Sequence, residues 1–152
     1  MKKYSLAIIS VLFFIATFRL LNRDFFYDEI YSCFHYIFVP LKQTVWVYKD
    51  LNNHVLFSLI CNLWMRLFAA NADLGWLMDR PWVLRIPTLM FSGVTIYYLY
   101  RIGKEYFNKR IGLYAIILLM TTVPYYYYVT QIRGYSLSVM FVTMLIYYLW
   151  RE

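Results

Sequence analysis

Long uncharged runs alternate with short charged stretches along this chain, and the length of each run indicates how it lies. An apolar helix needs about 20 residues to cross the hydrocarbon core of a bilayer. Four runs approach this length and end beside arginine or lysine, where membrane proteins often place these residues. We predict four membrane spans, at about residues 5–22, 83–100, 111–130 and 134–150.

Two further segments have a helical pattern but are too short to span. Over residues 29–39, apolar side chains recur on one side of a helix, which is typical of a helix lying along a membrane surface. Residues 54–70 have a polar side chain at every fourth position from His54 to Arg66. We predict both segments to be juxtamembrane helices in the first outer loop. The polar residues at 42–53 favour a loop between them.

The placement of the second short helix decides the topology. If residues 54–70 crossed the bilayer, the basic residues between 101 and 110 would face the outside. Short loops rich in lysine and arginine are normally cytoplasmic, so we place this loop inside and the helix outside. Lysines precede the first span and no small-x-small cleavage site follows it. We therefore expect an uncleaved anchor with a cytoplasmic N-terminus.

The composition also indicates a membrane protein. Hydrophobic residues make up 62% of the 152 residues and charged residues only 15%, against about 25% in a soluble domain. The net charge of +7 comes from basic residues at the ends of apolar runs, which argues against nucleic acid as a partner. Cys33 and Cys61 have neither metal-ligand nor disulfide spacing, so we interpret them as small apolar side chains. The predicted fold class is all-α, with one polytopic helical module over residues 1–152.

Candidate catalytic groups gather on the predicted outer side. Asp28 and Glu29 follow the first span, and the topology brings His54 and Arg133 to the same face. A carboxylate there can act as a general base if its surroundings raise its pKa. A guanidinium has the planar geometry that suits phosphate oxygens. We expect these four side chains to meet in one pocket above the bilayer.

Four short motifs follow one another along the chain. They are Asp28-Glu29 after the first span, Asn53-His54 before the next helix, Arg85-Ile86-Pro87 at the entry to a span, and Gln131 to Ser136 in a loop. In this order they resemble the N-terminal part of the GT-C membrane glycosyltransferases that use polyprenyl-phosphate sugars. That group includes the protein O-mannosyltransferases and the aminoarabinose transferases of lipid A. Its members are usually much longer, so we expect this chain to be a fragment that is inactive alone.

The resemblance implies a glycosyltransferase that moves a sugar from a polyprenyl-phosphate donor to a lipid, glycan or protein acceptor. Attack would invert the anomeric centre. Asp28 is then the catalytic base, and Glu29 is a second catalytic residue that orients Asp28 or the acceptor. We expect no metal and no other cofactor. Apart from donor and acceptor, membrane lipids are the expected partners, and a bacterial inner membrane is the expected location.

The resemblance also implies a set of substrate-binding residues. Arg133 would hold the donor phosphate, and His54 would bridge the phosphate or position the acceptor. Asn53 and Tyr135 stand in the same two motifs and complete the predicted set.

Each of these features also has a structural interpretation. Acidic residues favour the first turn of a helix, His54 can belong to the polar stripe of an interfacial helix, and arginine at a span end can anchor it at the membrane surface. We favour the anchor for Arg85. For the tyrosine runs we favour interface anchoring over sugar stacking. The alternative function is non-catalytic, namely a transporter piece, an assembly partner or an inactive remnant.

Overall fold

The computed structural model describes residues 11, 13, 15, 17–47 and 54–151, and over this part of the chain all regular structure is helical. The all-α prediction is therefore confirmed. After the first helix, which ends at residue 21, the elements are α2 (Tyr27–Ser32), the π-helix η1 (Cys33–Ile37), α3 (Leu41–Trp46), α4 (Val55–Phe68), α5 (Leu74–Met78), α6 (Trp82–Tyr106), α7 (Lys109–Thr121), α8 (Val123–Thr130) and α9 (Tyr135–Leu149).

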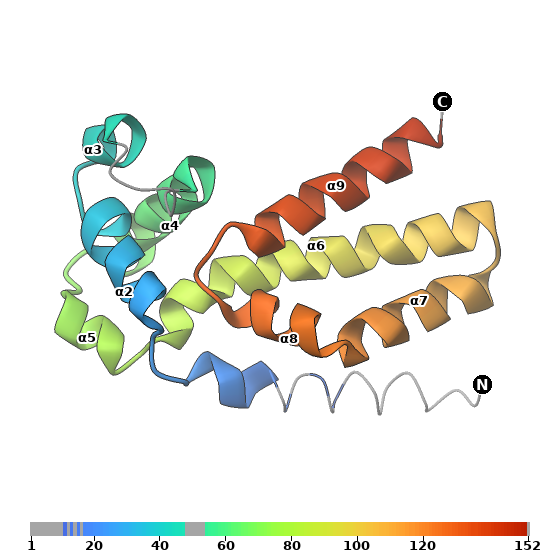
Figure 1. Ribbon diagram of the computed structural model, residues 1–152, viewed down its shortest axis with the longest axis horizontal. Coiled ribbons are helices and arrows are strands. Elements are labelled where there is room, and N and C mark those ends of the chain that lie inside the picture. The colour runs from blue at the N-terminus through green and yellow to red at the C-terminus, as the bar shows by residue number, and fades with distance from the viewer. Residues whose placement is uncertain (1–10, 12, 14, 16, 48–53, 152) are drawn as a thin grey trace.

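These helices form two regions, which Figure 1 shows side by side. The elements α2 to α5 cluster around the start of α6, and we call them the head. The helices α6 to α9 form the stem, in which α6 packs against α7, α8 and α9. The turn between α6 and α7 and the end of α9 lie at the far end of the stem from the head.

Two glycines allow α6 and α7 to approach closely near their turn. A Cβ atom added to Gly103 would lie 2.3 Å from the Cα atom of Gly112, and one added to Gly112 would lie 2.8 Å from the Tyr100 carbonyl oxygen. Asn108 begins α7, because its side-chain oxygen accepts hydrogen bonds from two backbone N–H groups of the first turn, at 2.9 and 3.0 Å. The hairpin therefore depends on small residues and a cap.

The segment predicted as a single span over residues 111–130 is divided. α7 ends at Thr121 and α8 begins at Val123, and the two helices meet at 71°. Pro124 lies in the first turn of α8, where its missing N–H costs no helical hydrogen bond. Among the described residues, no single helix is both long and apolar enough to cross a membrane, although α7 and α8 together have the required length and composition.

The head differs from the sequence prediction in two places. The segment predicted as one helix over 29–39 consists of α2 and the π-helix η1. The loop predicted over residues 42–53 is wrong for its first part, because α3 occupies Leu41–Trp46. Thr44 explains this helix in part. Its hydroxyl donates to the Tyr36 carbonyl at 2.8 Å and accepts from the Asn62 amide at 2.9 Å, so α3 is held against both neighbours.

The polar stripe of α4 faces the interior of the head. Ser58 and Asn62 are buried, and the Asn62 amide also donates to the Val39 carbonyl oxygen at 2.9 Å. Arg66 donates to the Asn62 side-chain oxygen at 2.7 Å and to the same Val39 carbonyl at 3.1 Å. The stripe therefore joins α4 to the segment before α3, because buried polar groups need hydrogen-bond partners.

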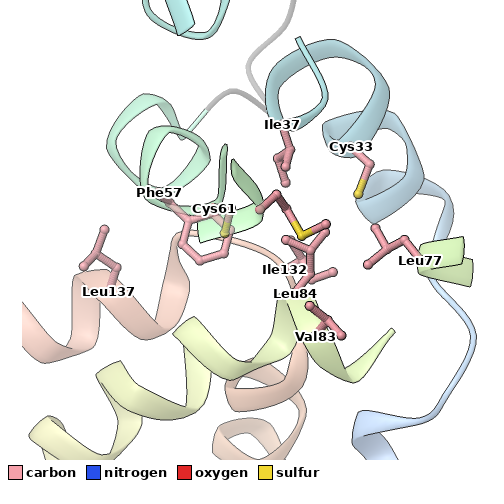
Figure 2. Packing of buried hydrophobic residues seen from close by; sticks show 10 residues of the cluster. Cys33, Ile37, Phe57, Cys61, Leu77, Val83, Leu84, Ile132 and Leu137 are labelled. Carbon is pink, nitrogen blue, oxygen red and sulfur yellow. The ribbon is translucent and has the colours of Figure 1, made fainter. Parts of the chain in front are cut away.

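The hydrophobic core lies where the head meets the stem (Figure 2). Cys33 and Cys61 are both fully buried in it as free thiols, which confirms their interpretation as apolar side chains. Burial and the nearby Glu29 raise the pKa of Cys33 to about 12, so this thiol is unreactive at neutral pH. The core contains residues from η1, α4, α5, α6, the α8–α9 loop and α9: Cys33, Ile37, Phe57, Cys61, Met65, Leu77, Val83, Leu84, Ile132 and Leu137.

Candidate functional site

A buried ion pair joins the first motif to the third. An Arg85 Nη atom lies 3.1 Å from the Glu29 carboxylate, and the two side chains are 2% and 1% exposed. The same guanidinium donates to four backbone carbonyl oxygens that end the first helix and lead out of it, those of Leu20, Leu21, Arg23 and Asp24. Such carbonyls have no partner within their own helix, and a cation satisfies them.

The interpretation of Arg85 as a surface anchor is therefore wrong. An anchoring arginine extends its charged end into water, whereas this guanidinium is enclosed by protein oxygens. Local sequence patterns do not reveal the partner of Arg85, because Glu29 lies 56 residues earlier in the chain.

Glu29 connects three segments through its two carboxylate oxygens. One oxygen accepts from the Arg85 guanidinium and from the backbone N–H of Phe26 at 2.8 Å. The Phe26 bond ties the carboxylate to the residue before the first turn of α2, which begins at Tyr27. The other oxygen accepts from the backbone N–H of Ile132 at 2.7 Å. Glu29 therefore fixes the neighbouring Asp28 relative to the neighbouring Arg133.

Asp28 and Arg133 form a second ion pair, closer to solvent. Their charged atoms are 2.5 Å apart, and their side chains are 50% and 16% exposed. Arg133 also donates to the Tyr135 hydroxyl at 3.1 Å. Since half of the Asp28 side chain remains accessible, its carboxylate can meet a ligand, which the enclosed Glu29 carboxylate cannot do as readily.

A pocket of about 220 Å³ opens at this second ion pair. It contains four of the predicted site residues, Asp28, Glu29, Arg133 and Tyr135, and three that the sequence did not single out. Those three are Phe26, Tyr128 and Gln131. A signal for Gln131 existed, since it opens the fourth motif. Tyr128 was not predicted, because it belongs to a tyrosine run and such runs are also typical of a membrane interface.

His54 lies beside the pocket rather than among its lining residues. Its ring is 5.7 Å from the Tyr135 ring, centre to centre. The neighbouring Gly134 makes this approach possible, because a Cβ atom there would lie 2.9 Å from His54 Cγ. Burial, and then the positive charge of Arg133, lower the pKa of His54 below its usual value, so its imidazole is neutral at pH 7. The predicted Asn53 lies outside the described residues.

Other parts of the described chain bring fewer reactive side chains together. A larger pocket of about 340 Å³ lies beside Arg66, but no acidic side chain lines it. No three His, Cys, Asp or Glu side chains come close enough within the described ranges to hold a metal ion. The pocket at Asp28 and Arg133 combines a carboxylate, a guanidinium and aromatic rings, so it can accept a proton, hold an anion and contact an apolar face.

A protein-family model with the description dolichyl-phosphate-mannose-protein mannosyltransferase matches residues 56–152. No curated protein and no solved structure matches the chain significantly. The matched part contains Arg85, Arg133 and Tyr135, whereas Asp28 and Glu29 precede it. The resemblance inferred from the four motifs is thereby confirmed. Because the matched residues are well over half of the sequence, the chain belongs to this family of integral membrane mannosyltransferases.

Proposed function

We propose that this chain provides the catalytic site for the transfer of a sugar from a polyprenyl-phosphate donor to a hydroxyl or amine acceptor on a lipid, glycan or protein. Membership of a mannosyltransferase family supports glycosyl transfer as the reaction class. The observation that carries the site assignment is the partly exposed Asp28–Arg133 pair in the 220 Å³ pocket. It supplies the base and the anion-binding group that such a transfer requires.

Asp28 is the proposed general base. As the acceptor oxygen or nitrogen bonds to the anomeric carbon, its proton passes to the Asp28 carboxylate. The bond between the anomeric carbon and the phosphate oxygen breaks, and its electron pair leaves with the polyprenyl phosphate. Attack from the side opposite the phosphate inverts the anomeric centre.

Arg133 is the proposed phosphate-binding residue. In the ligand-free pocket its guanidinium is paired with Asp28, and charge-assisted bonds to phosphate are also strong. Donor phosphate would replace the Asp28 carboxylate on Arg133, which leaves Asp28 available to the acceptor. Tyr135, bonded to Arg133, and neutral His54, in contact with the Tyr135 ring, would keep the guanidinium aimed at the phosphate.

Glu29 and Arg85 are proposed as positioning residues. Both are buried and hydrogen-bonded to the protein, so they act through Asp28 and Arg133 rather than on the substrate. Of the two roles expected for Glu29, we therefore propose the orientation of Asp28.

We place the pocket on the outer side of the membrane, with the N-terminus and the α6–α7 turn in the cytoplasm. The exposed Lys104, Lys109 and Arg110 support this placement, because they lie around the α6–α7 turn, at the opposite end of the stem from the head (Figure 1). We retain the four spans and a bacterial inner membrane as parts of the proposal.

The decisive experiment replaces the base. In the intact protein in its membrane, Asp28→Asn is expected to slow sugar transfer by about 100- to 10,000-fold, the usual contribution of a general base, while binding of polyprenyl phosphate remains. Asp79→Asn, an exposed acid in the head, is the matched control and keeps full activity. Undiminished transfer by Asp28→Asn would favour a non-catalytic role for this site.

A further inference from the structure

We propose that Tyr128 is the platform for the sugar ring of the donor. This inference rests on the proposed function and adds a specificity residue to it. It also revises the interpretation of the tyrosine run as a uniform interface anchor.

The four tyrosines of α8 have different surroundings. Tyr125 is buried and its hydroxyl is hydrogen-bonded to Ser92 of α6. The Tyr126 ring lies edge-on to Phe13, 6.0 Å away. Tyr127 and Tyr128 are 42% and 44% exposed, but of these two only Tyr128 lines the pocket. A general attraction of tyrosine to the membrane surface does not distinguish these neighbours, whereas the pocket does.

The groups around Tyr128 match the two sides of a sugar. Its ring lies 4.9 Å from the Tyr135 ring, and the two planes are inclined at 57°, so aromatic surface forms one wall of the pocket. The charged Asp28 and Arg133 and the amide of Gln131 lie on the same pocket. A pyranose has an apolar face of C–H groups and an edge of hydroxyls, which suit such an aromatic wall and polar rim.

The other parts of the donor fit this wall less well. A prenyl chain gains nothing from a carboxylate and a guanidinium, which lose their contact with water when an apolar chain covers them. A phosphate pairs with Arg133, as proposed above, but makes no use of the aromatic rings. The sugar is therefore the part of the donor that uses the aromatic and polar groups together.

The test compares donors with and without a sugar. The intact protein, reconstituted in phospholipid nanodiscs, is titrated with polyprenyl phosphate and with polyprenyl phosphates that bear mannose, glucose or galactose. At least one sugar-bearing lipid should bind more tightly than the sugar-free lipid. Tyr128→Leu should weaken that lipid by about 3- to 10-fold, the scale of one aromatic contact, and leave the sugar-free lipid unchanged.

Three variants separate the ring contact from other effects. Tyr128→Phe keeps the ring and should bind like the wild type. Tyr127→Leu removes a neighbouring tyrosine of nearly equal exposure and should change neither affinity. Arg133→Gln should weaken every lipid, because all of them carry the phosphate. Thermal unfolding of each variant shows whether it has folded.

The outcomes distinguish this inference from the proposed function. If Tyr128→Leu weakens all lipids equally, or behaves like Tyr127→Leu, Tyr128 is an interface anchor and the inference fails while the proposed function stands. The same holds if no sugar-bearing lipid binds better than polyprenyl phosphate. If the wild type binds none of these lipids, the proposed function fails and the inference fails with it.

Discussion

Two ion pairs of the same chemical type lie at opposite ends of α6. Arg85 and Glu29 pair where the head meets the stem, with side chains 2% and 1% exposed. Arg101 and Glu105 pair one helical turn apart near the far end, with side chains 31% and 34% exposed. The first pair joins two charges that are distant in sequence. The charges of the second pair are neighbours on one helix, and both also bond to the Tyr147 hydroxyl of α9.

Burial and connectivity, not the charges themselves, decide how much each ion pair contributes to the stability of the fold. An exposed pair is screened by water and contributes little. A buried pair loses its hydration, and it persists only where further hydrogen bonds satisfy both ions. Arg85 and Glu29 have those bonds, and the segments they join carry Asp28 and Arg133.

Removing the buried cation should strongly destabilise the protein. Arg85→Met leaves the Glu29 carboxylate buried without its cation, and breaking such a pair costs about 3–5 kcal/mol. Unfolding in detergent, followed by circular dichroism, measures the loss. Arg80→Met, which removes an exposed arginine of the same segment, should cost far less. The double variant Arg85→Met/Glu29→Gln should recover part of the loss, because no buried charge then remains.

At the far end, backbone contact rather than the ion pair should hold α6 on α7. Gly103→Ala places a methyl group 2.3 Å from the Gly112 backbone, and overpacking of this kind costs about 1–3 kcal/mol. Gly93→Ala is the matched control on the same helix, since nothing lies within 4 Å of its added Cβ. It should leave stability unchanged or raise it slightly. Equal effects of the two substitutions would contradict the close packing of the hairpin.

Mild acid should weaken the end of the molecule that contains His54. The pKa of His54 is lowered in the folded protein, so the unfolded chain binds a proton there more readily. The contribution of His54 to the free energy of unfolding is therefore fully present above the unfolded pKa of about 6.5. It is lost as the pH falls through the lower pKa of the folded state. Unfolding midpoints at a series of pH values between 7.5 and 5 measure this loss. His54→Gln should make the midpoint less dependent on pH over this range.

The smallest effect is expected at the exposed pair. Arg101→Gln should leave the unfolding midpoint of the protein almost unchanged, and so should Glu105→Gln, because both side chains remain in contact with water. A loss comparable to that of Arg85→Met would show that exposure does not explain the difference between the two ends.

Hydrophobic periodicity and charge were sufficient to predict a helical protein, and the motifs predicted that Asp28, Arg133 and Tyr135 belong to one site. The pocket contains all three. Other features depend on contacts that no local pattern encodes. Arg85 follows the sequence pattern of a surface anchor, and only its distance from Leu20, Leu21 and Glu29 in space shows its enclosure.

The remaining differences have similar causes. Polar residues over 42–46 indicated a loop because the pattern does not show that Thr44 is buried between Tyr36 and Asn62. The apolar run over 111–130 indicated a continuous helix because hydropathy does not register a change in direction. Tyr128 could not be separated from Tyr127 by composition, since only the direction of each side chain from α8 places one of them at the pocket.

The bend between α7 and α8 shows how side-chain hydroxyls can mark the point where a helix changes direction. Hydroxyl groups of Thr121 and Thr122 donate to the Ile117 and Leu118 carbonyl oxygens at 2.7 to 3.1 Å. Bonds of this kind, from a threonine hydroxyl to a carbonyl oxygen three or four residues earlier, often bend a helix. Two threonines thus accompany the change of direction, and the tyrosines of α8 point along different directions from the side chains of α7 as a consequence of the 71° bend.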